Sequence, residues 1–235
     1  MTRVRVAGLS VAVVLVSVLT LVPPAAANNY FAIRYWPTST NVSLSGGTAF
    51  RAYDTALISL SYRRDVAPNW AGSLNLDFGG QSNFAGTWTT ATEGSNTFWN
   101  VNLHRTFQGQ NTMMSLFAGY QRASSRSRFG TDQVQTVSGP RVGGDLVWHQ
   151  GSWGFMGWAA VGLGMAGSTT QPGSTTGSGG GSFSEFGALL IYTMSGWNFE
   201  GGYRVVNFGV PAGGSFLSAN FNTTGLTVGV SRMWP

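Results

Sequence analysis

Few side chains of this sequence have the types and spacing needed for acid–base or metal chemistry. The chain has two histidines, His104 and His149, and no cysteine. Two histidines without a third ligand make a weak metal site. If Asp145 and His149 lie on one strand, they are about 13 Å apart, too far for a hydrogen-bonded pair. We therefore expect no metal and no catalytic residue, although a Ser–His pair formed between distant strands stays open.

A glycine motif raises the question of a nucleotide cofactor. Residues 162–167 match the G-x-G-x-x-G pattern of dinucleotide-binding proteins. That motif functions where a helix follows and offers its N-terminus to the pyrophosphate. Here the following segment is rich in Ser, Thr, Gly and Pro, and residues 174–182 are predicted to form a flexible loop. We expect no cofactor.

The elements that would position these residues are strands. Ten stretches alternate apolar and polar side chains, as half-buried strands do. Short joints follow Arg64, Phe107, His149 and Met194, whereas longer joints fall at 37–54, 79–96, 122–140, 168–181 and 209–221. The regular change between short and long joints favours an up-and-down antiparallel barrel that crosses a membrane. Ten strands are expected, with eight as the alternative.

The alternation also assigns each side chain to a face. In residues 70–78, Trp70, Leu74 and Leu76 share one face with Phe78, and polar residues occupy the other. Applied along the chain, this rule predicts an inward-facing polar network of Arg34, Asp77, Asp145, Glu185, Glu200 and Arg204. Because buried charges must pair or meet water, these residues predict a mostly occluded lumen filled further by Phe117, Met156, Trp158 and Leu189.

Aromatic residues gather on the outward faces near the short joints. They predict an aromatic girdle at the periplasmic interface made of Tyr62, Trp70, Phe107, Trp148, Trp153, Tyr192, Trp197 and Trp234. Arg105 and Arg232 fall on the same outward face, close enough to the short joints for their guanidinium groups to reach lipid headgroups.

Composition and the N-terminus indicate export to an envelope. Charged residues make up 9% of the chain, against about 25% in ordinary soluble domains. Residues 1–27 have a basic start, an apolar run of about a dozen residues and an Ala-x-Ala ending, which predict a signal peptide cleaved after Ala27. The mature barrel would be residues 28–235. No mature segment has the roughly 20 apolar residues of a transmembrane helix, and no run of basic residues suggests nucleic-acid binding.

Together these features resemble the small bacterial outer-membrane β-barrel proteins, a generic class that includes porin-like and OmpA-like barrels. The resemblance covers residues 28–235 and implies an outer-membrane location with both termini in the periplasm. In that class an aromatic residue near the C-terminus helps the barrel-assembly machinery to recognise the last strand. Residues 227–234 end in Trp234 and resemble this signal, but Arg232 occupies a usually apolar place and Pro235 follows the aromatic.

The expected role is a monomeric envelope barrel without catalysis, serving structure, surface interaction or very restricted permeation. Its partners would be outer-membrane lipid and lipopolysaccharide. A basic loop with Arg122, Arg126 and Arg128 is a possible contact for lipopolysaccharide or another surface ligand. The alternatives are a small-solute channel, selective for cations if four inward acids face two arginines, a secreted soluble β-sandwich, and a barrel enzyme acting on lipid or peptide. Ten-stranded outer-membrane proteases use Asp and His near the outer rim, but His104 and His149 map to the opposite end.

Overall fold

A computed structural model describes residues 28–44, 49–79, 91–129, 131–171, 174–211 and 218–234. The predicted signal peptide and its cleavage site lie outside these residues. The described chain is all-β, with strands β1 Asn29–Leu44, β2 Ala49–Ala67, β3 Trp70–Gly79, β4 Ala91–Gln108, β5 Thr112–Phe129, β6 Thr131–Gln150, β7 Trp153–Gly162, β8 Met165–Gln171, β9 Ser174–Met194, β10 Trp197–Val210 and β11 Ala219–Trp234. Within this part of the chain no helix is long and apolar enough to cross a bilayer.

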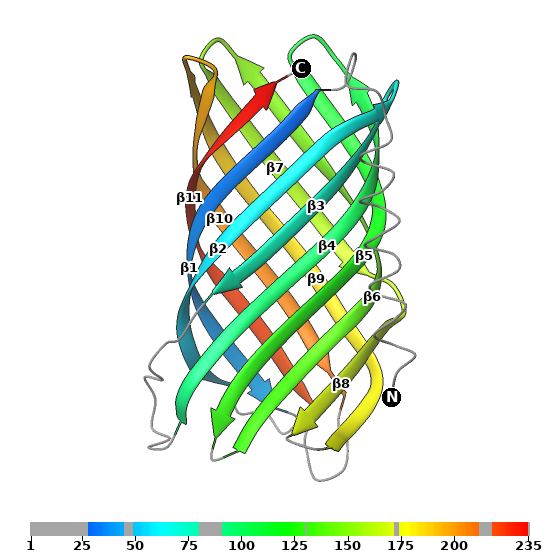
Figure 1. Cartoon of the computed structure of the whole chain (residues 1–235), viewed down its shortest axis with the longest axis vertical. Coiled ribbons are helices and arrows are strands. Elements are labelled where there is room, and N and C mark those ends of the chain that lie inside the picture. Colours follow the sequence, from blue (N-terminus) through cyan, green and yellow to red (C-terminus); the bar gives the residue numbers. More distant parts are fainter. Residues whose placement is uncertain are drawn as a thin grey trace.

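The strands form one closed antiparallel sheet (Figure 1). Apart from β7 and β8, each strand pairs with its neighbours in sequence, and β1 closes the barrel by pairing with β11, where Ile33 lies opposite Val230. Both β7 and β8 pair with β6 on one side and with β9 on the other, so they are two parts of a single strand. The predicted ten-stranded up-and-down barrel is confirmed, and the alternative of a two-sheet sandwich is wrong.

A bulge separates β7 from β8. Arg141 pairs with Gly162 and Ser138 pairs with Ala166, so β7–β8 has one extra residue between these points. The amide of Leu163 donates to the carbonyl of Pro140, and Gly164 has a φ of 57°. Pro140 has no amide proton to donate to the sheet, which favours a bulge beside it. The G-x-G-x-x-G motif thus forms a strand with a bulge.

The short joints are tight turns at one end of the barrel. At Ser195–Gly196 both residues have positive φ, 52° and 77°, as expected for the type I′ turn that matches the twist of a hairpin. This end of the barrel also holds the start of β1 and the end of β11, at the top of Figure 1. We call it the short-turn end.

Three of the five predicted long loops, 37–54, 122–140 and 168–181, are mostly strand where the structure describes them. In the other two, residues 80–90 and 212–217 lie outside the described residues. β5 continues to Phe129 and β6 begins at Thr131, although 122–140 was expected to be a loop. The predicted flexible loop at 174–182 forms the first part of β9 and pairs with β8. These corrections have one cause. The strands run on beyond the stretch where apolar residues face outward, and polar, glycine-rich sequence there can still pair edge to edge.

Two layers fill the barrel interior. Toward the end of the barrel opposite the short-turn end lies a cluster of buried, mostly apolar side chains. We call it the apolar plug, and it consists of Trp36, Val42, Tyr53, Leu57, Phe98, Ala123, Val137, Met165, Phe183, Val206, Phe208, Val210, Ala219 and Phe221. Its rings contact one another, as in the stacked pair Phe208–Phe221 with centroids 4.6 Å apart. Toward the short-turn end the interior is polar and charged, and this second layer holds the candidate site.

Candidate functional site

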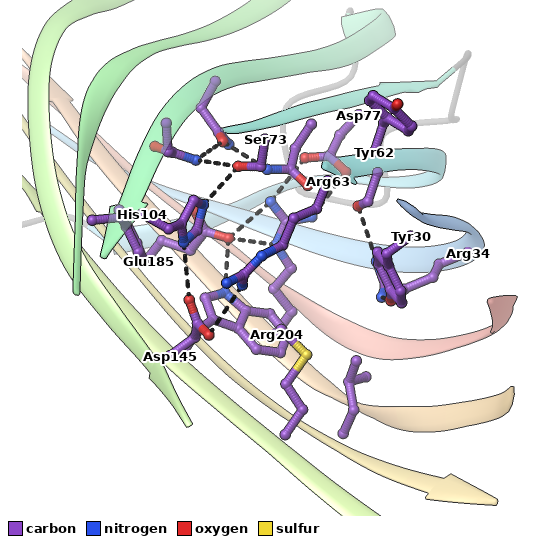
Figure 2. A pocket seen from close by; sticks show the side chains of 18 of the residues that line it. Tyr30, Arg34, Tyr62, Arg63, Ser73, Asp77, His104, Asp145, Glu185 and Arg204 are labelled. Atoms are coloured by element: carbon purple, nitrogen blue, oxygen red, sulfur yellow. Dashed lines mark hydrogen bonds and ion pairs between the residues drawn. The ribbon is translucent and has the colours of Figure 1, made fainter. Parts of the chain in front are cut away.

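A cavity of about 120 Å³ lies inside the barrel on the short-turn side of the apolar plug. We call it the chamber. Strands from all around the barrel supply its lining, so residues far apart in sequence meet across the lumen (Figure 2). Its wall combines charged and polar side chains with the apolar side chains of Phe117, Met156, Trp158 and Leu189. Gly187 leaves space for the Trp158 ring, which a Cβ at that position would strike.

Arg204 holds one group of charges together. Its two terminal nitrogens each lie 2.8 Å from a carboxylate oxygen of Asp77, a bidentate pair. Its Nε donates to Glu185 at 3.0 Å, and Glu185 also accepts from the indole nitrogen of Trp158 at 3.0 Å. The guanidinium lies 4.5 Å from the ring centre of Trp36. Arg204 therefore joins the charged chamber to the first ring of the apolar plug.

A second group surrounds Glu200 on the β1 side. Arg34 donates through Nε to Glu200 at 2.6 Å and through a terminal nitrogen to Ser61 at 3.0 Å. The hydroxyl of Tyr30 accepts from Arg34 at 2.6 Å and donates to Glu200 at 3.0 Å. Each charge in this group is thus paired and hydrogen-bonded, which is what burial requires.

A third group lies on the opposite wall. Asp145 lies 3.4 Å from Arg63, and its other oxygen lies 3.3 Å from Nδ1 of His104. Nε2 of His104 lies 2.8 Å from the hydroxyl oxygen of Ser73. The six residues of the predicted polar network thus lie in three connected groups inside the barrel. Sequence reasoning placed Arg63 and His104 on the inner face but gave them no role, and it did not single out Ser73.

Arg141 was missed altogether. It donates to Glu185 at 3.2 Å, and its guanidinium lies 5.1 Å from the ring centre of Phe117. The alternation through Gly143 and Asp145 would have placed Arg141 inward, but Pro140 was read as the end of a loop. With Arg63 and Arg141 included, four arginines meet the four carboxylates in these ion pairs. The imbalance of four acids against two arginines, which favoured cations, is therefore wrong.

A second cavity, of about 200 Å³, lies at the mouth of the short-turn end. It shares Tyr30, Arg63 and Met156 with the chamber, so the two cavities are neighbours. Its wall is partly apolar, through residues such as Ile191, and carries His149. His149 and His104 thus belong to different cavities. No group of three or more His, Asp or Glu residues in the described part of the chain could hold a metal ion.

Seven of the eight predicted girdle residues are exposed at the short-turn end: Trp70, Phe107, Trp148, Trp153, Tyr192, Trp197 and Trp234. The eighth, Tyr62, is half-buried, is among the residues that line the chamber, and donates its hydroxyl proton to Asn29. The two outward arginines contact aromatic residues of this girdle. The guanidinium of Arg105 lies 5.3 Å from the ring centre of Trp70, and that of Arg232 lies 5.3 Å from the ring centre of Trp197.

The predicted basic surface loop is wrong as a loop, because its three arginines lie within β5. The side chains of Arg122 and Arg126 are exposed on the outer wall. Arg128 pairs through its backbone with Asp132, and its side chain lies outside the described part of the structure.

Comparison with solved structures identifies the fold. The outer membrane protease OmpT of Escherichia coli matches with a TM-score of 0.61 and 14% identity, covering 90% of this chain and 97% of OmpT. This chain has the fold of a bacterial outer-membrane β-barrel. Weaker matches include the attachment invasion locus protein Ail of Yersinia pestis (TM-score 0.41, 10% identity, 88% of this chain and 99% of Ail) and Neisserial surface protein A (0.38, 13%, 86% and 96%). No protein-family model and no curated protein matches the sequence.

Proposed function

We propose that the protein is an outer-membrane barrel whose lumen is closed to solutes and which serves as a structural or surface-interacting component of the envelope. The observation that carries this proposal is the apolar plug. Trp36, Phe98 and Phe208 follow one another across the lumen, with ring centres 6.1 and 6.2 Å apart, and each is at most 1% exposed. Close packing of this kind leaves little path for water or ions.

The outer wall supports membrane insertion. Around the chamber, the outward faces carry large apolar side chains such as Leu116, Leu190 and Leu226, each more than half exposed. Monomeric soluble proteins seldom expose so wide an apolar surface, whereas a barrel in a bilayer is expected to have an apolar band bounded by aromatic residues. The short-turn end would then face the periplasm, as in the barrels that the sequence resembles.

The partners follow from this placement. The apolar band would contact lipid, and Arg122 and Arg126, which lie beyond it on β5, would face the phosphate groups of lipopolysaccharide. β11, which ends in Trp234, would present the signal for the assembly machinery. Because the sheet is closed, it leaves no strand edge for pairing, which is consistent with a monomer.

Planar-bilayer conductance tests the proposal. Purified mature protein, with folding checked by heat-modifiable mobility on an SDS gel, should give no stable discrete current steps at moderate voltage. Reproducible unitary steps would overturn the closed lumen and support the small-solute channel instead. A known open porin prepared in the same detergent is the control for insertion.

A further inference from the structure

Three side chains of the chamber, from three different strands, are arranged as a proton relay. Ser73 on β3, His104 on β4 and Asp145 on β6 are 5%, 5% and 6% exposed. The Ser73 hydroxyl oxygen lies 2.8 Å from Nε2 of His104, and Nδ1 of His104 lies 3.3 Å from Asp145 (Figure 2). This is the order nucleophile, base and orienting carboxylate that serves acyl transfer on unrelated folds.

The strand register explains how they meet. Ser73 lies opposite Asn102, and Ala71 lies opposite His104, so Ser73 and His104 are diagonal neighbours on the inner face of β3 and β4. One strand further on, Ser115 lies opposite Asp145, and His104 lies opposite Phe117. The closed, tilted sheet then carries Asp145 of β6 to the side of the imidazole away from Ser73.

Two hydrogen bonds and one close contact give the relay a direction. The side-chain amide nitrogen of Asn102 donates to the Ser73 oxygen at 3.1 Å. Because Ser73 accepts there, its own proton is available to donate to Nε2 of His104. Nδ1 of His104 is buried without a hydrogen bond, and the Asp145 carboxylate lies 3.3 Å from it. Because an ionised carboxylate can only accept, its proximity favours the tautomer with the proton on Nδ1. Arg63 on the other side of Asp145, at 3.4 Å, favours the ionised carboxylate. The imidazole thus offers a lone pair to the serine proton.

The chamber also has room for a substrate. About 10–15 Å³ suffices for one water molecule, so a cavity of about 120 Å³ accepts a short acyl group. The wall offers Phe117 and Met156 to the acyl chain and an N–H group of Arg63 to a developing oxyanion. Entry would be through the cavity at the short-turn mouth, which shares Arg63 and Met156 with the chamber.

We propose that Ser73, His104 and Asp145 form an acyl-transfer site for short-chain carboxylic esters that enter from the short-turn end. The Ser73 oxygen attacks the ester carbonyl while His104 takes the serine proton. The C–O bond to the alcohol breaks, His104 returns the proton to the leaving alcohol, and an acyl-serine remains. Water, deprotonated by His104, then cleaves the acyl-serine to release the acid and restore Ser73. Asp145 is a positioning residue that acts through His104.

This site goes beyond the proposed envelope role and departs from the expectation of no catalysis. The two proposals fail separately. A closed barrel can lack the esterase activity, and an open channel can retain it.

The first experiment measures hydrolysis of p-nitrophenyl acetate by the folded mature protein in detergent. The native protein should release p-nitrophenol above the detergent blank, and Ser73→Ala should reduce kcat at least about 100-fold. Ser59→Ala is the matched control, because Ser59 is a buried serine that does not line the chamber, and it should keep the native rate. Equal rates for native protein and Ser73→Ala would overturn the proposal.

The second experiment needs no variant that must fold. Methanesulfonyl fluoride forms a sulfonyl ester with an activated serine and releases fluoride. Intact-mass analysis of the native protein should show one sulfonyl group, which peptide mapping should place on Ser73. Absence of labelling, or labelling spread over exposed serines, would overturn the proposal.

A third experiment tests the positioning role of Asp145. Asp145→Asn should lower kcat and leave KM nearly unchanged, whereas a purely structural role of Asp145 would lower the folded fraction and not kcat per folded molecule.

Discussion

The two halves of the barrel have opposite polarity. In the half that contains the chamber, apolar residues such as Leu103 and Leu116 face outward, and polar residues such as Asn102 and Ser115 face inward. In the half that contains the plug, Thr97 and Arg122 are exposed outside while Phe98 and Ala123 are buried inside. The same strands, β4 and β5, cross both halves. The alternation thus continues without a break while its polarity reverses.

The difference indicates which medium, hydrocarbon or water, surrounds each half of the barrel and stabilises its fold. A wall surrounded by hydrocarbon needs no apolar lumen, because its outer face is already in an apolar medium, and its interior can hold paired charges. A wall surrounded by water must bury apolar side chains inside to be stable. We infer that the plug half projects beyond the bilayer and folds as a water-soluble barrel would.

The largest expected effect comes from leaving charges of the chamber half unpaired. Arg204→Ala removes the partner of Asp77 and one partner of Glu185, so it should destabilise the barrel by about 3–5 kcal/mol. The measurement is the urea midpoint of the heat-modifiable SDS-gel band. In the double variant Arg204→Met with Asp77→Leu, most of this loss should be recovered. A single variant as stable as the native protein would contradict the paired network.

Truncating the plug half should cost about as much or slightly less and should change a different property. Phe98→Ala removes a ring that contacts both Trp36 and Phe208, at a cost of about 3–5 kcal/mol. Combined with Trp36→Ala, it should also produce conductance in planar bilayers, which Arg204→Ala alone should not. If Arg204→Ala opened a pore and the plug variant did not, the barrier would lie in the chamber half.

The outer wall provides a third contrast. Leu76 lies six residues from Trp70, roughly 15 Å along the barrel axis, near the middle of the expected apolar band. Leu76→Arg should cost about 2–4 kcal/mol and reduce assembly into liposomes. The matched change on the plug half, Asn41→Arg, should be tolerated because Asn41 is exposed on the outer wall of β1, six residues beyond Tyr35 and outside the expected apolar band. Equal assembly of both variants would remove the difference between the two outer walls.

The smallest effect concerns a polar contact inside the plug half. The hydroxyl of Tyr53 donates to Asn96 at 2.5 Å and contacts Ser125, all three being buried. Burial raises the pKa of the Tyr53 phenol to about 12, so it stays protonated at ordinary pH. Tyr53→Phe should destabilise the barrel by about 1–3 kcal/mol by leaving Asn96 with one partner fewer. A change below 0.5 kcal/mol in urea unfolding would show that water replaces the hydroxyl.

The sequence predicted the chamber half better than the plug half. There the alternation gave the strands and the inward placement of residues such as Asp77 and Arg204. It could not give which charges pair, because Arg204 and Asp77 are 127 positions apart and meet only after closure of the barrel. The Ser73–His104–Asp145 relay was hidden for the same reason.

The plug half was predicted wrongly because its apolar residues face inward and its polar residues face outward, the reverse of the chamber half. Residues 122–140 and 174–182 were interpreted as loops from their polar and glycine-rich composition, yet residues 122–129, 131–140 and 174–182 lie in strands. The inner residues of β10 change from Glu200 and Arg204 to Val206, Phe208 and Val210. This change at constant period is the signal by which such a projecting half can be recognised.

The central claim is that the lumen has a water-accessible chamber on the short-turn side of a plug that excludes water. Thiol labelling tests this claim most directly, because the native chain has no cysteine. Ser61→Cys places a thiol on the chamber wall, and Ala123→Cys places one within the plug. In folded protein, a small charged methanethiosulfonate should modify the first thiol at least about 100-fold faster than the second, and both at similar rates after unfolding. Equal rates in the folded barrel would contradict the division of the lumen into two halves.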